Sequence, residues 1–142
     1  MKLNVFLLIL SSVMATSATA EIYDCKFDVK DRFKQWVPAV VRITNDADLS
    51  RVIVSAKLFD RFGKRAVPGE FGTNNSRRVT FRFQYNNSDI PIERKYNRVV
   101  LGLTSYSVTI QKADHSATFR ADPSHAFEPG NSFHGKGSCV LK

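Results

Sequence analysis

The sequence is poor in the residue types that build metal centres. It contains only two cysteines, Cys25 and Cys139, and three histidines, His115, His125 and His134. A zinc site needs several of these ligands to converge, and its sequence signature is a pair of ligands at short, fixed spacing. No Cys-x-x-Cys or His-x-x-Cys pair occurs, and the histidines share no ligand spacing on one face. We therefore expect no metal and no cofactor.

Motifs of common catalytic sites are also missing. Ser132 does not lie in the G-x-S-x-G turn of the hydrolases that carry this motif. Gly135 and Gly137 precede Cys139 in a predicted strand, whereas a phosphate-binding glycine loop opens a helix. The carboxylates are scattered, with no pair placed to face each other as in a glycosidase. We predict that the protein is not an enzyme, and we keep a hydrolase site assembled from loops as a last alternative.

Long apolar runs occur only near the N-terminus. Lys2 is followed by an apolar run of about ten residues, 5–14, and then by the small residues Ala18-Thr19-Ala20, which is the order of a secretory signal. The run is well short of the ~20 residues that a membrane-spanning helix needs. The pattern predicts a signal peptide over residues 1–20, and a single exported β domain over 21–142 without a transmembrane segment.

Export would carry Cys25 and Cys139 into an oxidising compartment, where disulfides form and persist. We therefore predict a Cys25–Cys139 disulfide, with two buried thiols as the alternative. A bridge between residues so far apart closes nearly the whole chain into a loop. The chain-entropy model assigns about 4–5 kcal/mol of stability to a loop of ~100 residues.

Alternation of apolar and polar residues is the main structural signal in the rest of the chain. It is clearest over residues 78–85, where every second residue is apolar, as in a strand with one buried face. Similar alternation occurs over residues 23–29, 37–43, 52–58, 117–121 and 133–141. Between residues 98 and 112 the phase changes by one residue, which predicts a β-bulge near Thr104 and Ser105 or, alternatively, a tight turn.

Turn-forming residues separate these runs. Clusters rich in Asn, Asp, Gly and Ser predict hairpin connections at residues 45–48, 60–63, 72–75, 86–89 and 113–116. Residues 30–35 are the one place where a short helical turn is expected. The pattern predicts an all-β antiparallel meander of about eight strands. If Cys25 pairs with Cys139, the first and last strands lie together, which favours a closed barrel. An immunoglobulin-like β-sandwich is the alternative.

Four short segments resemble a group of small exported bacterial proteins of unassigned function. The segments are Tyr23-Asp24-Cys25, Trp36-Val37-Pro38, Arg77-Arg78-Val79-Thr80-Phe81 and Phe133-His134-Gly135-Lys136-Gly137-Ser138-Cys139. The resemblance implies a β protein of the bacterial periplasm or the extracellular space. It carries no activity and no site residues.

Charge points to the class of partner. The chain has 21 Lys and Arg against 13 Asp and Glu, a net charge of +8, and such an excess attracts anions. Candidate anion-binding residues cluster around one predicted strand and its neighbours: Arg77, Arg78, Arg82, Lys64, Arg65, Arg94, Lys95 and Arg98. The expected partners are an anionic envelope polymer, a lipid surface or an acidic protein. Nucleic acid is not expected, because the aromatic residues of this strand point to its other face, away from the cations.

Aromatic residues on the inward faces form a second candidate site. They are Tyr23, Phe27, Phe81, Phe83, Tyr85 and Phe119. A barrel of about eight strands is either filled by its side chains or holds one small ligand. The leading hypothesis is therefore an exported, non-enzymatic binding module with a basic face. A lipocalin-like carrier of a small apolar ligand is the alternative.

Overall fold

A computed structural model describes residues 20–34, 36–46, 51–60, 66–86, 103–123 and 132–142. These residues form eight strands in chain order: β1 (Glu21–Asp28), β2 (Val40–Asn45), β3 (Val52–Ala56), β4 (Val67–Asn74), β5 (Arg78–Asn86), β6 (Leu103–Gln111), β7 (Ser116–Pro123) and β8 (Phe133–Leu141). A 3₁₀ turn, η1 (Asp31–Phe33), follows β1, and one helical turn, α1 (Lys57–Asp60), follows β3. Residues 1–19 of the predicted signal peptide lie outside the described ranges.

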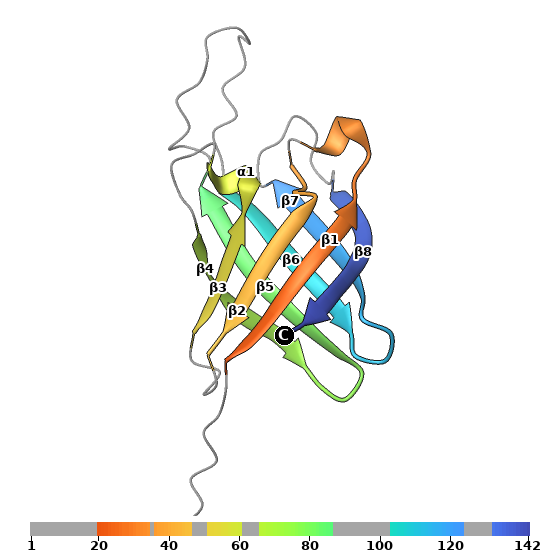
Figure 1. The fold of residues 1–142 in the computed structure, drawn as a ribbon. Helices are drawn as coiled ribbons and strands as arrows, with labels where there is room; N and C mark the ends of the chain where they lie inside the picture. Colours follow the sequence, from red (N-terminus) through yellow and green to blue (C-terminus); the bar gives the residue numbers. More distant parts are fainter. Residues whose placement is uncertain (1–19, 35, 47–50, 61–65, 87–102, 124–131) are drawn as a thin grey trace, which may run out of the picture.

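The strands form a closed antiparallel barrel (Figure 1). Each strand pairs with the next along the chain, and β8 returns to pair with β1. In the view of Figure 1, β1 and β2 lie in front, and β5 and β6 lie behind them. The predicted all-β barrel meander is confirmed, and the sandwich is excluded because β1 and β8 belong to one continuous sheet. Closure also removes the exposed strand edges on which other chains could pair.

The predicted disulfide joins the first strand to the last. Cys25 and Cys139 are directly opposite each other in the β1–β8 register, with their Cα atoms 3.9 Å apart and 114 residues between them in the sequence. Both are buried, so the bond lies inside the barrel. The covalent link therefore acts at the one strand pair that the meander does not join by a hairpin.

Gly137 allows β8 to approach β1 closely. A Cβ atom at this position would overlap the carbonyl oxygen of Lys26 and lie 2.8 Å from the Cα of Phe27. Both obstacles are backbone atoms, which cannot move aside while the β1–β8 pairing persists. Gly135 has a milder constraint, because its Cβ would meet side chains, including Val37 at 3.1 Å. The two glycines thus provide room for packing beside the disulfide, as the sequence indicates.

Alternation correctly identifies the core. Apolar side chains from all strands fill the interior, including the inward faces of residues 23–29 and 79–85. Two short segments close the upper end of the barrel in Figure 1. Phe59 of α1 is fully buried and stacks on Tyr85, with the ring centroids 5.8 Å apart. Beside η1, Trp36 stacks on Phe133 at 5.3 Å with the ring planes 5° apart.

Strand ends differ from the sequence expectation in two places. β3 stops at Ala56, and Leu58 reaches the core from α1 instead of from a continued strand. β2 begins only at Val40, and Ala39 is exposed although its parity predicted burial. Pro38 explains the second difference, because its missing N–H cannot join a ladder.

The predicted bulge near Thr104 and Ser105 is wrong. β6 pairs with β5 from Leu103 to Gln111 without a shift in register. A shift occurs instead in β4, between Phe71 and Thr73, within the segment predicted as a turn. The turn begins later, at Asn75, whose side-chain oxygen accepts hydrogen bonds from the backbone N–H groups of the second and third residues after it, each at 2.9 Å. Such Asx geometry terminates the strand.

The close approach at Gly137 generates a stability prediction. The Gly137→Ala substitution should lower the free energy of unfolding by about 3 kcal/mol or more, because the added methyl group forces β8 away from β1. Gly72→Ala is the matched control, since its new Cβ meets the flexible side chain of Arg82. Urea unfolding of both variants measures the difference. Equal stability of the two would contradict the close packing at Gly137.

Candidate functional site

The outer faces of β5, β6 and β7 form a continuous polar surface, which we call the polar wall. Period-two alternation turns one side chain of every pair outward, and register aligns the outward residues of neighbouring strands. Its residues are Arg78, Thr80, Arg82, Gln84, Ser105, Ser107, Thr109, Gln111, Ser116, Thr118, Arg120 and Asp122. Every one of these side chains can form hydrogen bonds.

Two arginines and a serine form one row across the polar wall. Ser107 on β6 is the register partner of Arg82 on β5 and of Arg120 on β7. Since neighbouring strands lie about 4.8 Å apart, the backbones carrying the two arginines are about 10 Å apart. The row borders an open depression of about 840 Å³, which Gln84 and Ser105 also line. The depression therefore has an arginine on each side with neutral polar groups between them, and the carboxylates Glu70 and Asp122 also line it.

Neighbouring polar groups hold Arg120 in place. Its Nε donates to both carboxylate oxygens of Asp122, at 2.7 and 2.9 Å. Its terminal NH2 group donates to the hydroxyl oxygen of Ser132 at 3.0 Å, and this hydroxyl in turn donates to Asp122. Charge-assisted hydrogen bonds of this kind fix a guanidinium geometrically. Arg120 therefore presents a fixed orientation at the edge of the depression.

The β4 bulge makes room for Arg82. A Cβ atom at Gly72 would lie 2.7 Å from the Nε of Arg82 and 3.1 Å from its Cζ, so the guanidinium rests over the backbone of Gly72. Glu70 is the register partner of Arg82 on β4 and also lines the depression. The site thus combines two arginines with two carboxylates, Glu70 and Asp122.

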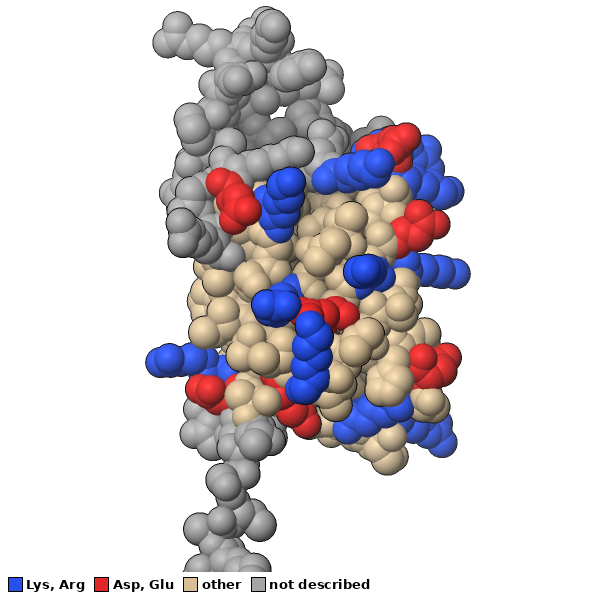
Figure 2. All heavy atoms as spheres, in the orientation of Figure 1, with Lys and Arg blue, Asp and Glu red and all other residues tan. Residues whose placement is uncertain are grey.

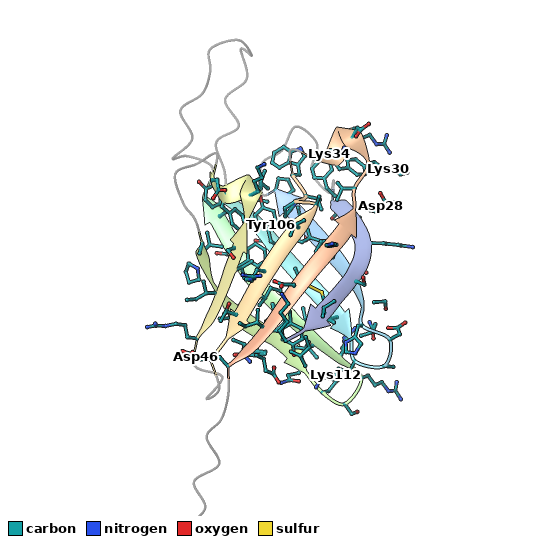
Figure 3. The ribbon with its side chains drawn as sticks, viewed as in Figure 1. Asp28, Lys30, Lys34, Asp46, Tyr106 and Lys112 are labelled. Atoms are coloured by element: carbon teal, nitrogen blue, oxygen red, sulfur yellow. A yellow bond between two sulfur atoms is a disulfide. The ribbon has the colours of Figure 1, made fainter. Side chains whose placement is uncertain are left out.

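The structure places three of the eight predicted anion-binding residues. Arg78 and Arg82 lie on the outer face of β5, and Arg77 is exposed in the turn before it. Lys112 lies beside them in the neighbouring turn, where its backbone N–H donates to the carbonyl oxygen of Arg77 at 2.9 Å (Figure 3). The other five predicted residues lie outside the described ranges: Lys64, Arg65, Arg94, Lys95 and Arg98.

Sequence reasoning missed Arg120, although a signal for it was present. Ala117, Phe119 and Ala121 share the inward parity, and all three are buried. Their alternation places Arg120 outward. The sequence does not show that β7 lies two strands from β5, and this neighbourhood is what brings Arg120 to the row with Arg82.

The comparisons with known proteins assign no function to the polar wall. Comparison with protein-family models, curated sequences and solved structures finds no match. Across the described ranges no group of three or more His, Cys, Asp or Glu side chains could hold a metal ion. No helix among the same residues is long and apolar enough to cross a membrane.

The six inward aromatics pack against one another and against their neighbours inside the barrel. Tyr23 contacts Phe81 with the ring centroids 5.4 Å apart, and Phe27 contacts Phe119 at 5.5 Å. The ring centroids of Phe83 and Phe119 are 6.0 Å apart. The sixth aromatic residue, Tyr85, stacks on Phe59 of α1. All six are buried. Their rings occupy the interior where the carrier hypothesis places a ligand.

Burial in this interior predicts an unusual titration. Burial raises the pKa of Tyr23 to about 12, aided by its hydrogen bond to Glu21, and burial raises the pKa of Tyr106 to about 12 (Figure 3). Both values exceed the ordinary 10.0. The stabilisation from these neutral hydroxyls is therefore complete below pH 10 and is lost as the pH rises through about 12. An ultraviolet titration of the wild-type protein should show two tyrosines that ionise near pH 12. The Tyr23→Phe variant should show one. Ionisation of every tyrosine near pH 10 would contradict a packed interior.

Proposed function

We propose that the protein is an exported, non-enzymatic binding module whose polar wall binds the acidic groups of an anionic envelope polymer. The observation that carries this proposal is the row in which Arg82 and Arg120 stand on either side of Ser107 above a polar depression. The buried Cys25–Cys139 disulfide supports export, because such bonds persist in oxidising compartments.

An acidic polysaccharide matches this wall in both of its functional groups. Guanidinium groups form paired hydrogen bonds with carboxylates. Arg82 can supply such a pair, and Arg120 can supply the N–H groups that Asp122 and Ser132 do not already engage. The serine, threonine and glutamine side chains around them can donate to sugar hydroxyls and accept from them. The wall has no apolar side chain among its described outward residues. A polar, hydroxyl-rich polymer therefore fits it better than an acyl chain.

Prior organisation of Arg120 favours binding. The hydrogen bonds to Asp122 and Ser132 already order the Arg120 side chain, so less rotamer freedom is lost when a ligand binds. The excess of Lys and Arg over Asp and Glu draws polyanions toward the molecule at low ionic strength. Specificity then comes from the spacing of the row, and attraction from the charge of the whole chain.

Removing the two arginines tests the proposal. We expect the Arg82→Gln/Arg120→Gln variant to bind immobilised polygalacturonate about tenfold more weakly for each arginine lost, because each loses a charged hydrogen bond. Salt-gradient elution and titration calorimetry measure this loss. Gly72→Ala should also weaken binding without removing charge, since the new methyl group displaces the Arg82 guanidinium.

A charge-matched control separates the row from general electrostatics. Lys26→Gln/Lys57→Gln removes the same charge from a different part of the surface and should leave most of the polygalacturonate retention. If both pairs reduced retention equally, net charge alone would explain binding and the polar wall would not be the site. If the Arg82→Gln/Arg120→Gln variant were retained on polygalacturonate as strongly as the wild-type protein, the proposal would also be refuted.

A further inference from the structure

The outer face of β8, β1, β2 and β3 differs in chemistry from the polar wall. We call it the aliphatic-cationic wall. Its outward residues are His134, Lys136, Ser138 and Val140 on β8, Ile22, Asp24, Lys26 and Asp28 on β1, Val40, Arg42 and Thr44 on β2, and Ile53 and Ser55 on β3. Four aliphatic side chains occur here, against none on the polar wall. The outward side chains of both walls lie outside the core of the same barrel, so folding of the barrel does not itself require this difference in their chemistry.

Three of the four aliphatic side chains of this wall are exposed, and Ile22 is half-buried. Val40 is 55% exposed, Val140 61% and Ile53 38%. Leu141, at the end of β8, is 45% exposed. These four are the exposed large hydrophobic residues in the described part of the chain. No two of them are register partners: Val40 is opposite Lys26, Val140 is opposite Asp24 and Ile53 is opposite Thr44. They are separate apolar points distributed among polar and charged groups on this half of the barrel, and not one continuous patch.

Cations are interleaved with these aliphatics. Lys26 is the register partner of Val40 on one side and of Ser138 on the other. Lys57 lies at the end of the same wall, where it lines a depression with Val40. Within the described ranges neither lysine forms an ion pair. Figure 2 views this wall from the front and shows Lys and Arg side chains, together with Asp and Glu side chains, spread among uncharged residues.

The acid at the centre of the wall is already neutralised. The Asp24 carboxylate accepts a hydrogen bond from Nε of Arg42 at 2.6 Å and pairs with Nζ of Lys142 at 2.5 Å. These partners, Arg42 first, hold the pKa of the Asp24 carboxyl well below its usual range. Two cations therefore surround this anion. The wall carries two further acids, Asp28 opposite Lys136 and Asp60 beside Lys57, so five cations (Lys26, Arg42, Lys57, Lys136 and Lys142) stand against three acids.

Two adjoining depressions of about 510 and 580 Å³ hollow this wall beside β2. They share Val40, Lys57 and Asp60, and their linings are mostly apolar, with Pro38 and Ala39 in the upper one. An occupant of these depressions meets an apolar floor and a charged rim, in which cations outnumber the acids Asp24 and Asp60. The complementary chemistry is an acyl chain joined to an anionic headgroup.

We propose that the aliphatic-cationic wall docks on the surface of an anionic lipid bilayer. Branched aliphatic side chains enter the boundary between headgroups and acyl chains, while lysines keep their ammonium groups at the phosphates. An acidic protein fits less well, because the core of a protein interface is enriched in aromatic residues and no outward residue of this wall is aromatic. The assignment is independent of the polar wall, which stays free to bind a polymer.

Vesicle sedimentation tests this assignment. The purified, oxidised protein should sediment with vesicles of equal parts phosphatidylglycerol and phosphatidylcholine, and not with pure phosphatidylcholine. Each cation at an anionic surface contributes about fivefold to affinity, so Lys26→Gln/Lys57→Gln should bind about 25-fold more weakly. Val40→Ser/Val140→Ser, with charge unchanged, should lose about tenfold from the apolar contribution.

The control is Arg82→Gln/Arg120→Gln, which removes equal charge from the polar wall and should retain vesicle binding. Equal loss in the lysine and arginine pairs, or full binding by the valine variant, would overturn the lipid assignment. Retention on immobilised polyglutamate without vesicle sedimentation would also overturn it, in favour of an acidic protein. Polygalacturonate binding is measured in a separate assay. A failure of the lipid assignment can therefore be distinguished from a failure of the polymer proposal.

Discussion

The pairing of β1 with β8 is the constraint on which the rest of the structure depends. The other seven strand pairs follow from a chain that turns back on itself, whereas this pair joins residues separated by most of the sequence. Three features act together there: the Cys25–Cys139 bond, the absence of a side chain at Gly137, and the register that sets the two cysteines opposite each other. Once this pair forms, the sheet has no edge, and every strand has one face inside and one outside.

Closure has a direct consequence for function. Aromatic and aliphatic side chains lie inside the barrel, and in the described part of the chain the charged groups lie on its outer walls. The polar wall carries Arg82 and Arg120 among hydroxyl and amide groups, and the aliphatic-cationic wall carries Val40, Val140 and Ile53 among lysines. Because the two walls use different strands, a protein lying on an anionic membrane by one wall could hold an acidic polymer with the other.

The sequence predicted what depends on local pattern and missed what depends on neighbours. Alternation over residues 78–85 identified β5 and its buried face, and the two cysteines predicted closure. β4 was missed because Pro68, Gly69 and Gly72 interrupt any alternation, and the turn was therefore placed at Gly72. The Arg82–Ser107–Arg120 row and the Lys26–Val40 pairing depend on register between strands. Register follows from packing of the whole barrel, and no single segment encodes it.

The most direct test of this account is an amide-resolved NMR titration of the oxidised protein with polygalacturonate oligomers. Chemical-shift changes should centre on Arg82, Ser107 and Arg120 and spread along the neighbouring outward residues of β5, β6 and β7. The amides of β1 and β2 should change little. Shifts concentrated on β1 and β2, or changes that follow positive charge over the whole surface, would contradict the claim that the polar wall is the binding site.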